Sequence, residues 1–123
     1  GTETILLVDD EESIRNLGCQ VLEDFGYTVL VAADGESALD LYREVNERVS
    51  LVVLDLIMPG MGGKRCFEEL LQINPEVRVA IASGYSPDGP TREVLKNGAR
   101  GFIAKPYDIA QMLKEVRKML DQD

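Results

Sequence analysis

The sequence predicts an α/β fold, in which a doubly wound sheet of five parallel strands, in the order 2-1-3-4-5, carries helices on both faces. Five short apolar runs alternate strictly with five segments whose apolar residues recur at spacings of three and four. Strict alternation indicates a parallel sheet, because each crossover between parallel strands is filled by a helix. Right-handed crossovers then leave few topologies. With 123 residues, the chain is expected to form one domain, residues 1–123.

The five apolar runs are bounded by turn-forming residues and predict the strands. The run from Leu51 to Leu54 is continuously apolar and is followed by Asp55 and a Pro/Gly turn, which is typical of a strand covered on both faces. The expected strands are Thr4–Val8, Thr28–Ala32, Leu51–Asp55, Arg78–Ala82 and Gly101–Ala104.

Capping signals and helical periodicity predict a helix after each strand. The first helix is expected to stop at Gly26, and Asp34 is expected to cap the second. Asp108 and Gln111 predict a capping box for the last helix. The residues expected to face the core from the first and last helices are Ile14, Leu17, Val21, Leu22, Phe25, Ile109, Met112, Leu113, Val116 and Met119.

The composition excludes several classes of function. There are 13 basic and 22 acidic residues, and the net charge of −9 repels nucleic acid and anionic membranes, so neither is expected as a direct partner. No apolar stretch is long enough to cross a bilayer and no signal peptide is seen, so we expect a cytoplasmic protein in which Cys19 and Cys66 are largely buried thiols. The absence of histidine excludes histidine-based triads, imidazole metal sites and a role as phosphohistidine carrier.

Polar residues stand at the carboxyl ends of four of the expected strands. Asp9 and Asp10 follow the first, Asp55 ends the third, Ser83 follows the fourth and Lys105 follows the fifth. In a parallel sheet these ends share one edge, and a cleft opens where the strand order reverses. Taken alone, the aspartate pair could be acidic residues that stabilise a helix N-terminus. The serine could be an ordinary turn residue, and the lysine could be a solvated surface residue. Their common edge instead favours one shared site.

The expected site has a chemistry that suits phosphoryl transfer. Three neighbouring carboxylates repel one another unless a cation is present, and oxygen ligands favour Mg²⁺ or a similar ion such as Mn²⁺. A carboxylate can also act as a nucleophile toward phosphorus. A metal at Asp10 and Asp55, with Lys105 and Ser83 at the other phosphoryl oxygens, would supply the charge neutralisation that this reaction needs.

Four motifs at these spacings resemble the receiver domain of two-component signalling, over essentially the whole chain. They are Val8-Asp9-Asp10-Glu11, Asp55 with Met58-Pro59-Gly60, Ser83-Gly84 and Lys105-Pro106. The resemblance implies a flavodoxin-like fold and transfer of a phosphoryl group to Asp55 from a phosphohistidine on a sensor histidine kinase or phosphotransfer domain. It also implies that Asp10, Asp55 and the backbone carbonyl of Ile57 bind Mg²⁺, with Asp9 acting through water.

The resemblance assigns further roles to the last two strands. Ser83 and Lys105 would hold the phosphoryl oxygens, and the Lys105–Pro106 peptide bond would be cis. Phe102 matches the family's switch aromatic and would turn inward as Ser83 moves, although plain core packing is the alternative. The usual output surface, also a possible dimer interface, would lie on the fourth helix, the fifth strand and the fifth helix, within Pro90–Asn97 and Gly101–Leu120.

Other features bear on the parent protein and on phosphate lifetime. Ile57 and Tyr85 resemble the family's tuning positions, and their bulk predicts restricted water access and slow loss of phosphate. The local sequences around Ser83 and Lys105 resemble those of receivers attached to hybrid sensor kinases. Because no effector domain is present, we expect the output to lie elsewhere in a longer parent chain or in a partner. A stand-alone or effector-linked response regulator is the alternative.

Three other interpretations remain open. A flavodoxin-like cofactor binder would need a Ser/Thr/Gly-rich loop after the first strand, where this chain has four acidic residues, Asp9 to Glu12. A metal-dependent phosphatase with an aspartyl nucleophile would need a second acid where Ile57 stands. A receiver-shaped module that is never phosphorylated usually lacks an acid or the lysine, and this chain keeps all of them.

Overall fold

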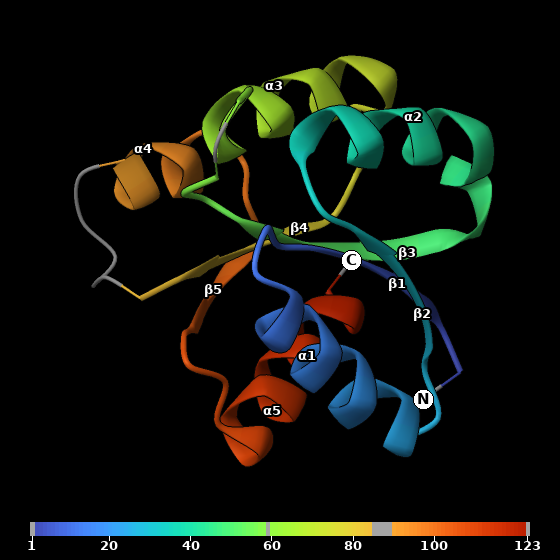
Figure 1. The fold of residues 1–123 in the computed structure, drawn as a ribbon. Helices are drawn as coiled ribbons and strands as arrows, with labels where there is room; N and C mark the ends of the chain where they lie inside the picture. The colour runs from blue at the N-terminus through green and yellow to red at the C-terminus, as the bar shows by residue number, and fades with distance from the viewer. Residues whose placement is uncertain (1, 59, 85–89, 123) are drawn as a thin grey trace.

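The structure is a computed structural model that describes residues 2–58, 60–84 and 90–122 of the chain. Strands and helices alternate along it as predicted (Figure 1). The elements are β1 (Thr4–Val8), α1 (Glu12–Asp24), β2 (Thr28–Ala32), α2 (Gly35–Val45), the short 3-10 helix η1 (Asn46–Arg48), β3 (Val49–Asp55), α3 (Gly63–Ile73), β4 (Val79–Ser83), α4 (Pro90–Lys96), β5 (Gly101–Ala104) and α5 (Ile109–Leu120).

The five strands form one sheet in the order β2-β1-β3-β4-β5, and every neighbouring pair is parallel. Figure 1 shows α2, α3 and α4 on one face of this sheet and α1 and α5 on the other. The predicted fold class and strand order are therefore confirmed. Strands β1 and β3 are adjacent although they are not consecutive in sequence, so the strand order reverses between them and their carboxyl ends flank the expected cleft.

Alternating residues of the central strands pack into two separate apolar cores. Leu6 and Val8 of β1 belong to the core beneath α2 and α3, whereas Ile5 and Leu7 belong to the core shared with α1 and α5. Each of these four side chains is fully buried. The period of two follows from the pleat of a strand, and burial on both sides explains why the strand sequences are apolar throughout.

The predicted buried face of α1 is wrong in two positions. Leu17 is 39% exposed and Phe25 is 55% exposed. The residues of α1 that are buried against the sheet are Gly18, Val21 and Leu22. Periodicity could not identify Gly18 as part of this stripe because glycine has no apolar side chain, and Phe25 lies at the C-cap, past the last helical turn.

The capping predictions for α2 and α5 are confirmed at the N-cap residues. Asp34 accepts a hydrogen bond from the backbone N–H of Ser37, and Asp108 accepts one from the N–H of Gln111. The side-chain amide of Gln111 also donates a hydrogen bond, from Nε2 to Glu115 one turn later. Ile109, expected to be inward, is 53% exposed because it begins the helix ahead of the buried stripe that starts at Met112.

The ends of two strands and the burial of one cysteine differ slightly from the predictions. β3 begins two residues earlier than expected, at Val49, and β4 ends one residue later, at Ser83. Cys66 is buried as predicted, whereas Cys19 is only half-buried. None of the helices in the described ranges has both the length and the apolar character needed to cross a bilayer.

Candidate phosphoryl-transfer site

The carboxyl edge of the sheet brings the five predicted polar residues to one place. Asp9 and Asp10 directly follow β1, Asp55 is the last residue of β3, Ser83 is the last residue of β4, and Lys105 directly follows β5. All except Asp9 line one open cleft of about 610 Å³. Asp9 is completely buried behind the cleft, where it contacts Lys105.

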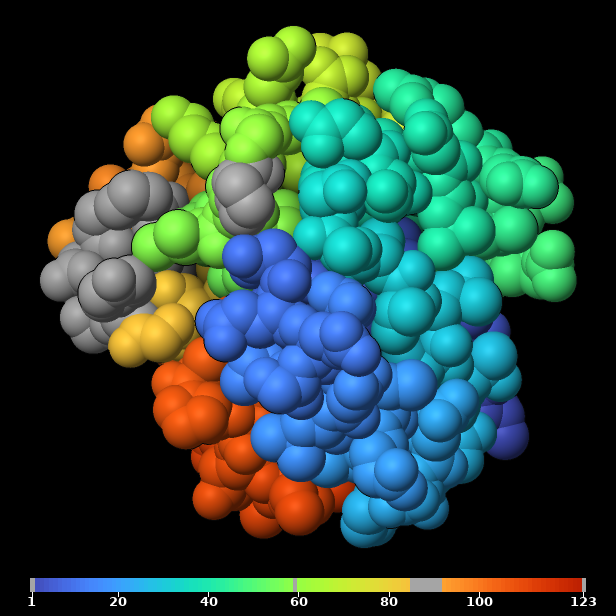
Figure 2. All heavy atoms as spheres, in the orientation of Figure 1, coloured from blue at the N-terminus to red at the C-terminus, as the bar shows by residue number. Residues whose placement is uncertain are grey.

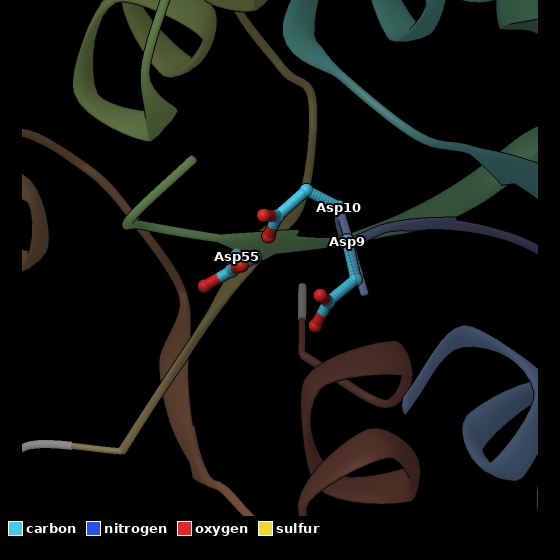
Figure 3. Close-up of side chains that lie close together, drawn as sticks. All are labelled: Asp9, Asp10 and Asp55. Carbon is cyan, nitrogen blue, oxygen red and sulfur yellow. The ribbon is translucent and has the colours of Figure 1, made fainter. Parts of the chain in front are cut away.

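The three aspartates form a tight cluster of oxygen ligands. Oxygens of Asp9, Asp10 and Asp55 all lie within 4.8 Å of one another. Figure 3 shows the side chains of Asp9 and Asp10 reaching this region from the end of β1 and that of Asp55 from the end of β3. Asp10 is exposed to solvent, whereas Asp9 and Asp55 are buried, so the cluster is open on one side.

Lys105 is the cation that contacts this cluster. Its Nζ lies 2.8 Å from Asp9 Oδ2 and 3.4 Å from Asp55 Oδ2, and its side chain is only 12% exposed. Burial alone would lower the pKa of this lysine, but the hydrogen bond to Asp9 and the charge of Asp55 outweigh burial, and the pKa is raised. Lys105 is therefore a largely buried ammonium at the site, not the solvated surface lysine that sequence alone also allowed.

A single lysine contacts a cluster of three carboxylates, so the positive charge beside them is smaller than the negative charge they can carry. Burial, followed by the negative charge of Asp9, raises the pKa of Asp55 from its ordinary value of 3.8 to about 7, despite the opposing charge of Lys105. A second positive charge would relieve this repulsion. Three close carboxylates on an open cleft match the hard oxygen ligands that Mg²⁺ prefers, so the residues present fit such an ion.

Backbone groups and one unpredicted side chain fix the aspartates. The N–H of Glu11 donates to Asp9 Oδ1 at 2.9 Å, and the N–H of Ile57 donates to Asp55 Oδ1 at 3.3 Å. Arg15 of α1 donates from Nη1 to the carbonyl oxygen of Asp9 at 2.8 Å. No pattern in the sequence pointed to Arg15, since a cation one turn inside a helix is usually a solvated residue.

The remaining predicted residues lie around the same cleft. Ser83 is 3% exposed, and its carbonyl oxygen accepts a hydrogen bond from the N–H of Lys105 at 2.9 Å, which ties β4 to the segment after β5. The Lys105–Pro106 peptide bond is cis. Phe102 is half-buried and packs against the core beneath α2, α3 and α4. Tyr85, the second tuning position, lies outside the described residues.

The mouth of the cleft is framed by three chain segments that are distant in sequence. Ile57 is 59% exposed, and together with Ile14 and Pro106 it lines the opening. Figure 2 shows the face on which the start of α1, in blue, meets the green segment that follows β3 and the orange segment that leads to α5. Apolar side chains from three segments therefore line part of a charged cleft.

Comparison with known proteins identifies the family. The family model for the response regulator receiver domain matches residues 5–117. The chain belongs to the response regulator receiver domain family. This receiver is 37% identical to sporulation initiation phosphotransferase F of Bacillus subtilis over 118 residues, which cover 96% of this chain and 94% of that protein.

Two further relatives show how the same domain occurs in different settings. The receiver is 36% identical to the sensor kinase CckA of Brucella abortus over 122 residues, which cover 99% of this chain but only 13% of the kinase. Its fold matches the CheY of a CheX–CheY–BeF₃–Mg²⁺ complex from Borrelia burgdorferi with a TM-score of 0.92 and 29% identity, covering 98% of this chain and 90% of that one. The chain is thus a receiver domain of two-component signalling, with an acidic cluster of the kind at which receivers bind Mg²⁺.

Proposed function

We propose that Asp55 is the phosphoacceptor of this receiver and takes its phosphoryl group from a phosphohistidine on a sensor histidine kinase or phosphotransfer domain. The observation that carries the proposal is the placement of Asp55, which ends β3 on the floor of the cleft with the Lys105 ammonium at 3.4 Å. An Asp55 carboxylate oxygen attacks phosphorus while the P–N bond to the imidazole breaks. The electron pair stays on the imidazole nitrogen, which takes up a proton, and Asp55 becomes an acyl phosphate.

The residues that would hold Mg²⁺ are Asp10, Asp55 and the carbonyl oxygen of Ile57, with Asp9 acting through water. A bound ion would supply positive charge to the phosphoryl oxygens. Support comes from the clustered carboxylates and from Ile57, which lines the cleft beside Asp55. Mn²⁺ has similar ligand preferences and would serve as well.

Lys105 and Ser83 would contact the phosphoryl oxygens that the metal ion does not. Lys105 already points its ammonium at Asp55, and Ser83 lines the same cleft from the end of β4. A fixed positive charge beside Asp55 stabilises the charge that develops during transfer. Lys105 would also hold the product in place after the imidazole has left.

The partner would dock on the apolar rim of the cleft. Ile14, Ile57 and Pro106 come from three segments and line the cleft that the phosphohistidine must enter. Their side chains would exclude water from the reacting atoms once a partner covers them. A partner with matching apolar residues beside its phosphohistidine would therefore be favoured.

The signal would leave through α4, β5 and α5. Ser83 would move toward the phosphoryl group, and Phe102, which is half-buried on β5, would turn further inward. This movement would change the exposed surface of α4, β5 and α5, where an output partner or a second receiver could bind. We propose further that the chain is one domain of a longer cytoplasmic hybrid sensor kinase. The likeness to CckA supports this parent, and a stand-alone or effector-linked regulator is the alternative.

Intact mass spectrometry tests the proposal directly. The protein is incubated with Mg²⁺ and a small acyl phosphate, and the expected result is the addition of one phosphoryl group. Asp55→Asn should abolish the gain, whereas Asp40→Asn, an exposed aspartate of α2 whose side chain is 81% exposed, should leave it unchanged. An unmodified wild-type protein would favour a receiver-shaped interaction module, and a gain that survives Asp55→Asn would move the acceptor elsewhere.

A further inference from the structure

Gly18 occupies an unusual position in α1. It lies near the middle of the helix and is buried with Val21 and Leu22 on the face that meets the sheet. Glycine is among the least favourable residues in a helix interior, because its backbone loses the most freedom on folding. A requirement of the fold at this position would explain why a better helix former does not occupy it.

That requirement is space for two side chains. A Cβ atom at Gly18 would lie 2.8 Å from Leu7 Cδ2 and 3.1 Å from Tyr107 Cε2. Both distances are shorter than ordinary van der Waals contact, so an added methyl group would force one or both neighbours to move. The helix is therefore in direct contact with β1 and with the segment between β5 and α5 at one point.

Both neighbours of Gly18 are close in sequence to the ion pair of the site. Leu7 precedes Asp9 by two residues on β1, and Tyr107 follows Lys105 by two residues. Leu7 is completely buried and Tyr107 is 7% exposed, so neither can relax into solvent. Lys105 Nζ and Asp9 Oδ2 are 2.8 Å apart, which means that a small displacement of either segment would alter this contact and the one to Asp55.

We propose that Gly18 is a positioning residue for Lys105, an inference that rests on the proposed role of Lys105 in phosphoryl transfer to Asp55. The absence of a side chain lets the Tyr107 ring lie against α1. The ring in turn fixes the segment that carries Lys105, so that its ammonium reaches both Asp9 and Asp55. A side chain at position 18 would push Tyr107 outward and shift Lys105 away from the phosphoryl oxygens.

The first test compares Gly18→Ala with Asn16→Ala, a substitution at an exposed position of the same helix. Phosphorylation by a small acyl phosphate with Mg²⁺ is followed by intact mass. Gly18→Ala is expected to slow the reaction about 3- to 10-fold, because misplacement by a fraction of an ångström weakens transition-state contacts. Asn16→Ala should react at the wild-type rate. A wild-type rate for Gly18→Ala would overturn the proposal.

A double-mutant cycle separates positioning from general loss of stability. In a Lys105→Ala background, where the ammonium is already gone, Gly18→Ala should produce no further decrease in rate. The same fold-decrease in both backgrounds would show that Gly18 acts on folding alone. In a Tyr107→Leu background, Gly18→Ala should slow the reaction less than it does in the wild type, because the smaller side chain leaves room for the added methyl group.

Two outcomes keep this inference apart from the proposed function. A wild-type protein that takes up no phosphoryl group would refute the proposed function, and the role of Gly18 with it. A phosphorylated wild type whose rate is insensitive to Gly18→Ala would refute the positioning role alone. If Gly18→Ala fails to fold, Tyr107→Leu by itself tests the same contact, and an unchanged rate for that variant would contradict the proposal.

Discussion

The two ends of the sheet each carry a cluster of acids around one cation, and the clusters behave in opposite ways. At the carboxyl edge, Lys105 contacts buried Asp9 and Asp55. At the amino edge, Arg117 of α5 contacts Glu3 at 2.6 Å and Asp121 at 2.9 Å. At the carboxyl edge, burial and then the negative charge of Asp9 raise the pKa of Asp55 to about 7, whereas hydrogen bonding to Arg117 lowers the pKa of Glu3 to about 2.

The contrast suggests that the cluster around Arg117 stabilises the fold, whereas the cluster around Lys105 is suited to binding. The cluster around Arg117 is partly exposed, and the carboxylate of Glu3 is stabilised in its charged form. In the cluster around Lys105, Asp9 and Asp55 are buried while Asp10 is exposed. Burial of Asp55 beside the charge of Asp9 disfavours its charged form, which opposes folding until a cation or a proton relieves it. A site that must receive a metal ion and a phosphoryl group has to retain such unsatisfied charge, and the rest of the fold must offset its cost.

The largest expected effect is that of removing the site cation. Lys105→Ala should lower the rate of phosphorylation by an acyl phosphate on the order of 100-fold, because a preorganised charge at the phosphoryl oxygens is lost. Arg117→Ala removes the cation at the opposite edge and serves as the control. It should leave the rate near that of the wild type. Equal losses in the two variants would show that the rate reflects folding and not the site.

A smaller effect is expected for the apolar cover of the cleft. Ile57 is 59% exposed at its rim, and Ile57→Asn should admit water to the phosphorylated site. Phosphate loss should become about 3- to 10-fold faster, which corresponds to roughly 1 kcal/mol of activation free energy. The decay of the phosphoprotein after removal of donor measures this effect. Unchanged or slower decay in the variant would count against restricted water access as the cause of a long lifetime.

The raised pKa of Asp55, caused by burial and by the charge of Asp9, should be visible in stability measured without divalent cations. The folded-state pKa of Asp55 is raised from 3.8 to about 7, so its destabilising contribution develops as pH rises from about 4 and is complete above about 7. At pH 8 in a chelator, Asp55→Asn should raise the free energy of unfolding on the order of 2 kcal/mol. At pH 4.5 the difference should largely disappear. Denaturant unfolding at the two pH values measures the free energy of unfolding of both proteins. An Asp55→Asn variant less stable than the wild type at pH 8 would contradict the account.

The smallest effect is expected at the amino edge, with the opposite dependence on pH. The pKa of Glu3 is lowered to about 2, so its stabilising contribution is present above about pH 4.5 and is lost as pH falls through 2. Because this ion pair is partly exposed, Glu3→Gln should lower the melting temperature at pH 7 by only about 1–4 °C. The loss should shrink toward pH 2. A pH-independent loss would indicate a packing defect.

The sequence predicted the fold and the site well because both depend on strand ends. Runs of apolar residues ending in Asp9, Asp55 or Ser83 locate the carboxyl edge of a parallel sheet, and topology then brings the residues together. Rotation of the helices was less predictable. Leu17 and Phe25 are exposed although they fit the periodic pattern, because the contact face of α1 is centred on Gly18.

Contacts formed only in the folded structure could not be predicted from sequence. Arg15 donates to the carbonyl oxygen of Asp9, yet nothing distinguishes it in the sequence from a solvated cation. Nothing in the sequence distinguishes Tyr107 from an ordinary core aromatic residue. Its hydroxyl is buried without a hydrogen-bond partner among the described residues, and its ring lies against Gly18. Such features depend on the orientation of whole elements, and local sequence patterns do not encode that orientation.

The most direct test of the central claim is to locate the phosphoryl group on the chain. The protein is phosphorylated with an acyl phosphate and Mg²⁺ and then treated with borohydride, which reduces an aspartyl phosphate to homoserine, and its peptides are sequenced by mass spectrometry. The account predicts homoserine at position 55 and unmodified aspartate at positions 9 and 10. Homoserine at Asp9 or Asp10 in place of Asp55 would contradict it.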